Sequence, residues 1–252
     1  MSRQFSRDFL IEVAKGNIAG HSMVHKFGRN TATSGSWEHI SLLPFSTTDF
    51  RQSAISMRVK AGGNAADTAA GAGAREITIQ GIDSNFAELS EAVATAGASA
   101  SAATSATFWR VHRAWVSAVG TYTAANTAVV TIEDSGSGAD FLTIGTEEGQ
   151  SQYTGWTVPL GKTAYLLSVH VTTDGAKAAD FRVMTRKNID DIAAPMNSVR
   201  LKLYWDGVLG NFVYKPLGPE FSLPEKSDIW VEALASTPSE VTCDFELLVV
   251  DD

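Results

Sequence analysis

Apolar and polar residues alternate along most of the chain, in short runs bounded by glycine, proline, asparagine, aspartate or serine. The runs are rich in valine, isoleucine, threonine and aromatic residues, a composition that with a period of two is typical of β-strands. They are residues 53–61, 75–83, 108–120, 127–133, 141–144, 163–171, 181–186, 198–205, 211–215, 228–235 and 241–250. We therefore expect a mainly β protein with an antiparallel sandwich or jelly-roll-like body.

The alternation also predicts which side chains point into the core. In two runs, every second residue is apolar and most of the residues between them are polar. The expected inward residues are Val199, Leu201, Leu203 and Trp205 in the first run, and Val241, Cys243, Phe245, Leu247 and Val249 in the second.

The start of the chain has a different pattern. Residues 7–15 show helical spacing and are followed by Gly16, a common helix stop. The glycine-punctuated residues that follow, up to Asn30, are expected to form an extended arm. We divide the chain into an N-terminal helix and arm that act as an anchor (1–50), a first β module (51–150), and residues 151–252, which form either a second module or a continuation of the same sandwich.

Two segments, residues 60–74 and 90–106, consist almost entirely of alanine, glycine, serine and threonine. They are either long surface loops or places where small side chains allow close contact between subunits. Residues 85–93 have Phe86, Leu89 and Val93 at helical spacing, which predicts a short helix.

The composition excludes several classes of protein. Of 252 residues, 44% are apolar and 19% are charged, enough apolar material for a packed core and too much for wholesale disorder. The formal charge of −8 argues against a broad nucleic-acid-binding surface. The single cysteine excludes an internal disulfide. We find neither a secretory signal nor an apolar run of about 18 residues, so no membrane association is expected.

Three segments match known functional motifs only in part. Residues 155–163 resemble a phosphate loop, but the glycine spacing is wrong and Pro159 removes an amide. Residues 20–24 resemble a hydrolase nucleophile elbow without its second glycine. His21 and His25 have zinc-helix spacing, but no glutamate follows the first histidine, and Glu38 and His39 are only neighbours in sequence.

Other reactive side chains have simpler explanations. Cys243 falls at an inward position and is expected to be a buried, inert thiol. Arg110, His112 and Arg113 lie beside tryptophans, where cation–π packing or pairing between subunits accounts for them. Because no position gathers a nucleophile, a base and an oxyanion donor, we predict a protein that is not an enzyme and has no catalytic residues, cofactor or metal.

Four segments together resemble the β-rich virion structural proteins of tailed bacteriophages, especially marine phages: residues 12–30, 71–97, 108–122 and 228–252. The resemblance implies a multi-copy component of the particle, assembled in the bacterial host cytoplasm and retained in the virion. It further implies a capsid-decorating or cement protein, expected as a homotrimer.

The N-terminal anchor is then expected to bind the major capsid protein or another virion subunit. Apolar side chains of the helix and arm would be buried against that neighbour, each worth about 1.5–3 kcal/mol before ordering costs. The expected partner-binding residues are Phe5, Phe9, Leu10, Val13, Phe27 and Arg29.

Three alternatives remain open. The chain could be a tail, neck or fibre component of the same particle. It could be a carbohydrate-binding module that stacks host glycans on Trp37, Trp156 and Trp230. It could also be a hydrolase of host-surface glycans, which requires two carboxylates about 5–10 Å apart in a cleft.

Overall fold

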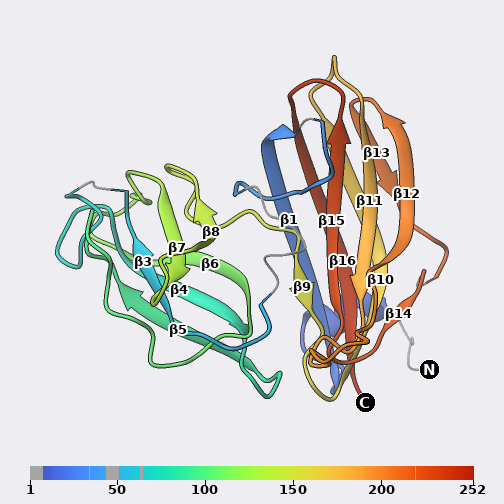
Figure 1. The fold of residues 1–252 in the computed structure, drawn as a ribbon, viewed down its shortest axis with the longest axis horizontal. Helices are drawn as coiled ribbons and strands as arrows, with labels where there is room; N and C mark the ends of the chain where they lie inside the picture. The colour runs from blue at the N-terminus through green and yellow to red at the C-terminus, as the bar shows by residue number, and fades with distance from the viewer. Residues whose placement is uncertain (1–7, 34, 44–50, 63–64, 219) are drawn as a thin grey trace, which may run out of the picture.

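A computed structural model describes residues 8–33, 35–43, 51–62, 65–218 and 220–252. As the alternation predicts, the protein is mainly β, with antiparallel sheets and one short helix, α1 (Phe9–Ala14). The strands form two bodies that lie side by side (Figure 1). We refer to them as the small module, built from β3 to β8, and the large sandwich, built from the remaining strands.

The large sandwich consists of two sheets that enclose one hydrophobic core. The first sheet has the order β1 (His21–Thr33), β16 (Ser239–Asp251), β10 (Lys162–Thr173) and β13 (Asn211–Tyr214), with β14 (Ser222–Leu223) also paired to β10. The second has the order β12 (Arg200–Val208), β11 (Ala179–Arg186), β15 (Asp228–Ala235) and β2 (Glu38–His39), with β9 (Trp156–Thr157) also paired to β15.

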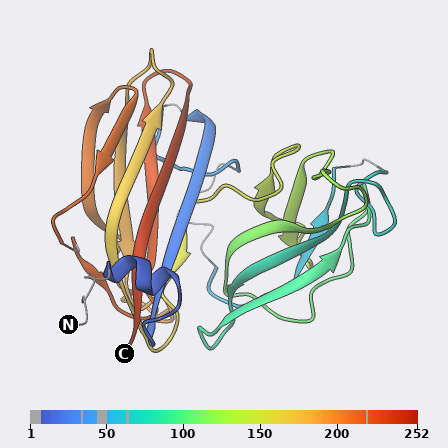
Figure 2. The ribbon, with the colours of Figure 1, turned by 180° about the vertical axis from the view of Figure 1, so that it is seen from behind.

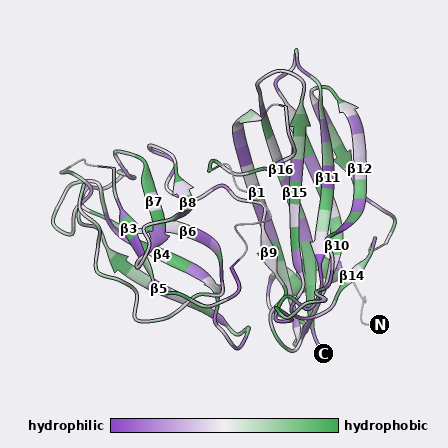
Figure 3. Ribbon diagram, in the orientation of Figure 1, coloured by the Kyte–Doolittle hydropathy of each residue, from purple (hydrophilic) through white to green (hydrophobic). Residues whose placement is uncertain are grey.

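The small module has two three-stranded sheets around a separate core. One sheet has the order β3 (Met57–Lys60), β7 (Val130–Asp134) and β8 (Asp140–Ile144). The other has the order β5 (Glu88–Ala94), β4 (Ala74–Ile82) and β6 (Arg110–Val119). Hydrophobic and hydrophilic residues alternate along the strands of both bodies, as amphipathic sheets require (Figure 3).

The segment expected to be an extended arm is instead a strand of the large sandwich. β1 pairs antiparallel with β16 from His21 opposite Val250 to Thr33 opposite Ser239. The other side of β16 is already paired with β10, so β1 supplies hydrogen-bond partners to an edge that would otherwise be open. Residues 21–33 are thus part of their own subunit's fold.

The helix expected over residues 85–93 is also wrong. Residues 88–94 form β5, which pairs with β4 along its length. The Asp83 side chain accepts hydrogen bonds from the backbone amides of Asn85 and Ala87, and Phe86 has a positive φ of 62°. This tight turn reverses the chain so that sheet pairing prevails over a weak helical pattern.

The inward face of β16 is as predicted: its five apolar residues are all buried in the core of the large sandwich. Burial, and then the charge of Asp244, raises the pKa of Cys243 well above its usual value, consistent with an inert thiol. In β12 the prediction is only half right. Leu203 packs against the core opposite Val183, but a β-bulge then shifts the register and places Leu201 opposite Met184, on the outer face.

The alanine-rich segments wrap around the small module. Ser101 and Thr104 donate backbone hydrogen bonds to the carbonyls of Val59 and Met57, which covers an edge of β3. The fully buried carboxylate of Asp67 accepts hydrogen bonds from the amides of Ala74, Thr127 and Ala128. Loops without regular structure are thereby held by backbone hydrogen bonds within the chain.

Candidate functional site at the junction of the two modules

The free edge of β1 faces the small module. The amide of Tyr153 donates to the carbonyl of Phe27 at 2.9 Å, and Arg113 Nη2 donates to the carbonyl of His25 at 2.7 Å. Edge strands expose unpaired carbonyls that invite association with other chains. Here two of these carbonyls are satisfied by the other module.

Ion pairs also cross the junction. Arg110 of β6 reaches Asp228 of β15 at 3.1 Å, and both side chains are buried. The other carboxylate oxygen of Asp228 accepts a hydrogen bond of 2.6 Å from the Thr157 hydroxyl. Arg29 of β1 pairs with Glu148. The sequence suggested Arg110 and Arg29 for contacts between subunits. In the structure, both arginines form ion pairs with carboxylates of their own chain.

Gly28 lies at a close approach between β1 and the segments that cross it. A Cβ at this position would overlap the carbonyl oxygen of Ile40 and the side chain of Thr154. We expect Gly28→Ala to lower the free energy of unfolding by about 1–3 kcal/mol, the usual cost of overpacking. Gly175, whose Cβ would meet nothing within 4 Å, provides the control for urea denaturation, and equal effects of the two substitutions would contradict the argument.

Lys26 is an unusual residue at the junction. Its side chain is only 3% exposed, donates to the carbonyl of His112 and lies 5.4 Å from the centre of the Tyr153 ring. Burial, and then the charge of Arg113, lowers the pKa of Lys26 well below its usual value. Burial and then the charges of Lys26, Arg110 and Arg113 similarly lower the pKa of His112.

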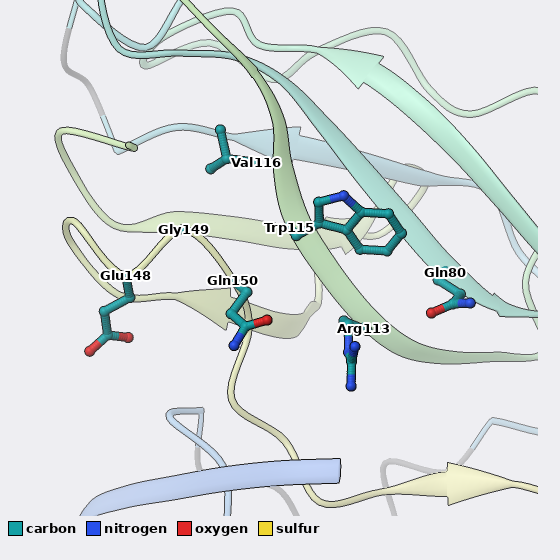
Figure 4. Close-up of a pocket in the computed structure, with 7 residues that line it drawn as sticks. All are labelled: Gln80, Arg113, Trp115, Val116, Glu148, Gly149 and Gln150. Atoms are coloured by element: carbon teal, nitrogen blue, oxygen red, sulfur yellow. The ribbon is translucent and has the colours of Figure 1, made fainter. Parts of the chain in front are cut away.

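Two cavities, each of about 510 Å³, flank Arg113 and Gln80. One is lined by Trp115, Val116 and the segment from Glu148 to Gln150, and Figure 4 shows Arg113 directed from β6 towards β1. The other lies between β1 and the sheet of β4, β5 and β6. Its walls include Lys26, His112 and Trp156.

A second polar cluster lies on the outer face of β15. Glu232 accepts hydrogen bonds from Trp230 Nε1 at 2.7 Å and from Arg182 Nε at 2.6 Å, and it lies 3.4 Å from His39 Nε2. Burial by itself raises the pKa of Glu232. The hydrogen bonds from His39, Trp230 and Arg182 outweigh that effect and hold the pKa at about 2.

Those predicted partner-binding residues that the structure describes do not form one surface. Phe9 and Leu10 are exposed on α1, whereas Val13 of the same helix is buried in its own subunit. Phe27 and Arg29 lie on β1 and contact the small module through the bonds described above. Phe5 lies outside the described residues.

Two of the three tryptophans suggested for stacking sugars are buried, and the third is partly covered. Trp156 and Trp230 are buried, and the ring of Trp37 packs 4.1 Å from the Arg182 guanidinium and beside Tyr204.

His21 and His25 lie on strand β1 and not on a helix, so their zinc-helix spacing has no structural counterpart. Among the residues described by the structure, no group of three or more histidine, cysteine, aspartate or glutamate side chains could hold a metal ion. Within the same residues, no helix is long and apolar enough to cross a membrane.

Comparison with known proteins gives little further information. No family model matches the chain, and no curated protein matches it. Among solved structures, the chain is similar to a chain in the structure of infectious bursal disease virus strain Gx. The two chains have 9% sequence identity and a TM-score of 0.24, and the match covers 92% of this chain and 72% of the other. Derived T=1 particles of that virus (8% identity, TM-score 0.20, coverage 92% and 74%) and its VP2 subviral particle (8%, 0.18, 92% and 76%) are also similar. Similarity this low supports no conclusion about the present chain.

Proposed function

We propose that the protein is a non-enzymatic structural component of a phage virion, attached to a neighbouring subunit through the exposed apolar residues of α1. The observation that carries the proposal is the exposure of Phe9, Leu10 and Ile11, at 47%, 36% and 51%. Three consecutive large apolar side chains left in water at one end of a fold are typical of a contact surface.

The helix is held in place and does not hang from a free arm. The Asp8 side chain caps it by accepting from the amides of Leu10 and Ile11, and the ring of Phe9 packs edge-on against His21 at 5.6 Å. Figure 2 shows α1 at the end of the first sheet of the large sandwich, near the C-terminus. Because the helix is ordered before contact, docking need not pay the ordering cost of a free tether.

The energy available from this face is modest for one copy. Burying each of the three side chains contributes about 1.5–3 kcal/mol before the costs of association. Many copies on one particle act together through avidity, so weak contacts suffice in a shell. This arrangement supports a decorating or cementing role on a capsid, with the major capsid protein as the proposed neighbour and a trimer as the proposed state.

The test is incorporation of serine variants into particles. We expect the triple variant Phe9→Ser/Leu10→Ser/Ile11→Ser to fold but to be largely absent from purified virions. Quantitative mass spectrometry of the virions measures its incorporation. The matched control replaces Leu201, Leu209 and Val213 by serine; these exposed apolar residues lie on β12, in the turn that follows it and on β13.

Normal incorporation of the helix variant would contradict attachment through α1. If the control is lost and the helix variant is retained, the exposed apolar residues of β12 and β13 form the attachment surface instead. The copy number from the same experiment separates capsid from tail, because a shell holds many more copies than a tail, neck or fibre.

A further inference from the structure

The cavity between β1 and the sheet of β4, β5 and β6 has an unbalanced charge. Lys26 and Arg113 both line it, and among the described residues neither forms an ion pair with a carboxylate. Glu88 also lines this cavity and is solvent-exposed, as is Ser22, so the space opens to solvent. Two cations thus face one carboxylate across a hollow of about 510 Å³.

A buried histidine adds a second, independent feature. His112 is only 5% exposed, and its Nε2 atom has no hydrogen-bond partner among the described residues. The ring lies 6.0 Å from that of Trp156, which forms another wall of the cavity. Buried polar atoms nearly always have a partner, so an orphan nitrogen at a cavity wall indicates that something else supplies one.

The charged form of Lys26 is also unfavourable at this buried position. An ammonium group removed from water without a counter-charge is strongly unfavourable, and one backbone carbonyl compensates only part of that cost. An anion in the cavity would balance Lys26 and Arg113 and could accept a hydrogen bond from protonated His112 Nε2. Apolar replacements at position 26 would avoid the cost, but they could not bind an anion.

We propose that this cavity is a binding site for the carboxylate or phosphate group of a small ligand, with Lys26 and Arg113 as its charged contacts and His112 as a further donor. The site is formed by both modules, since Lys26 belongs to the large sandwich and the other two residues to the small one. It is separate from the exposed face of α1, so it does not depend on the proposed attachment to a virion.

Isothermal titration calorimetry on the full chain tests the site with two probes, sulfate for a phosphate-like group and glucuronate for a carboxylate. We expect saturable binding of at least one probe with a Kd of about 1 mM or below. Lys26→Met and Arg113→Gln should each weaken it at least about tenfold. Lys215→Met, on the exposed segment after β13 at the opposite edge of the first sheet, removes the same charge and should leave binding unchanged.

The pH dependence provides a further readout. The titratable and charged groups around Lys26 are His25 on its own strand, His112 and Arg113 on β6, Glu88 on β5 and the ring of Tyr153. An anion favours the protonated forms of Lys26 and His112, and burial lowers the pKa of both groups, so binding should tighten as the pH falls below neutral while both probes keep their charge. Lys26→Met should remove part of this dependence.

Binding of sulfate alone or of glucuronate alone supports the site and identifies its preferred group. The proposal is overturned if neither probe binds saturably, or if Lys26→Met and Arg113→Gln bind as tightly as Lys215→Met. Thermal melting with and without the probe checks that each variant is folded. We expect Lys26→Met to melt no lower than the wild type, because it removes a buried cation.

Discussion

Arg110→Met should lower the free energy of unfolding by about 3–5 kcal/mol, the usual cost of breaking a buried ion pair by removing one partner. Arg110 and Asp228 are both buried and lie 3.1 Å apart. The substitution leaves the Asp228 carboxylate in a buried place with only the Thr157 hydroxyl as a hydrogen-bond donor among the contacts described above. Because the pair joins β6 to β15, its loss also weakens the junction of the two modules.

Urea denaturation at neutral pH measures this loss. The matched control is Lys162→Met, which breaks the exposed pair with Asp251 and should cost about 0–1 kcal/mol. The double variant Arg110→Met/Asp228→Asn should recover part of the stability, because it removes the uncompensated charge. A loss below about 1 kcal/mol for Arg110→Met would show that water or another group replaces the guanidinium.

The fold class follows from the sequence because sheet pairing depends on a local pattern. In β16, every second residue is apolar, and the same five residues fill the core of the large sandwich. A period of two specifies both the strand and its buried face. The pattern does not specify partners, so it could not show that the first strand of the chain pairs with the last.

The sequence does not predict a strand over residues 21–33 because their inward positions are not uniformly apolar. Val24, Lys26, Gly28 and Asn30 alternate along β1, and only the first of them is a typical core residue. Gly28 is required by a close backbone approach and Lys26 contacts the small module, and neither feature is visible in sequence. A lysine at an inward position of an extended run would have been the available signal.

The sequence also does not predict which residues of β12 lie on its outer face, for a related reason. Strict alternation places Leu201 and Leu203 on the same face, but the bulge between them reverses the face of Leu201. A single extra residue in one strand is enough to invert every side chain beyond it.

The sequence indicates that Arg110 and Arg29 make contacts, but it does not identify their partners. Asp228 and Glu148 lie more than a hundred residues from Arg110 and Arg29, respectively, in sequence.

Acid should destabilise the protein partly through Glu232, and Glu232→Gln should remove that part. The unfolded pKa of glutamate is about 4.5, and the fold lowers it to about 2. A group whose pKa is lowered on folding stabilises the folded state above its unfolded pKa, and this contribution is lost as the pH falls through the folded value. Converting the shift gives about 3 kcal/mol, present above pH 4.5 and lost by about pH 2.

The measurement is the free energy of unfolding in urea at a series of pH values from about 7 to about 2. Relative to the wild type, Glu232→Gln should be less stable at neutral pH, because Arg182 and His39 lose their carboxylate, and its stability should fall less between pH 4.5 and pH 2. Glu246→Gln, at an exposed position of β16, is the matched control and should follow the wild-type slope. Parallel curves for Glu232→Gln and the wild type over this range would show that the cluster of Glu232, His39, Arg182 and Trp230 does not hold the carboxylate in its charged form.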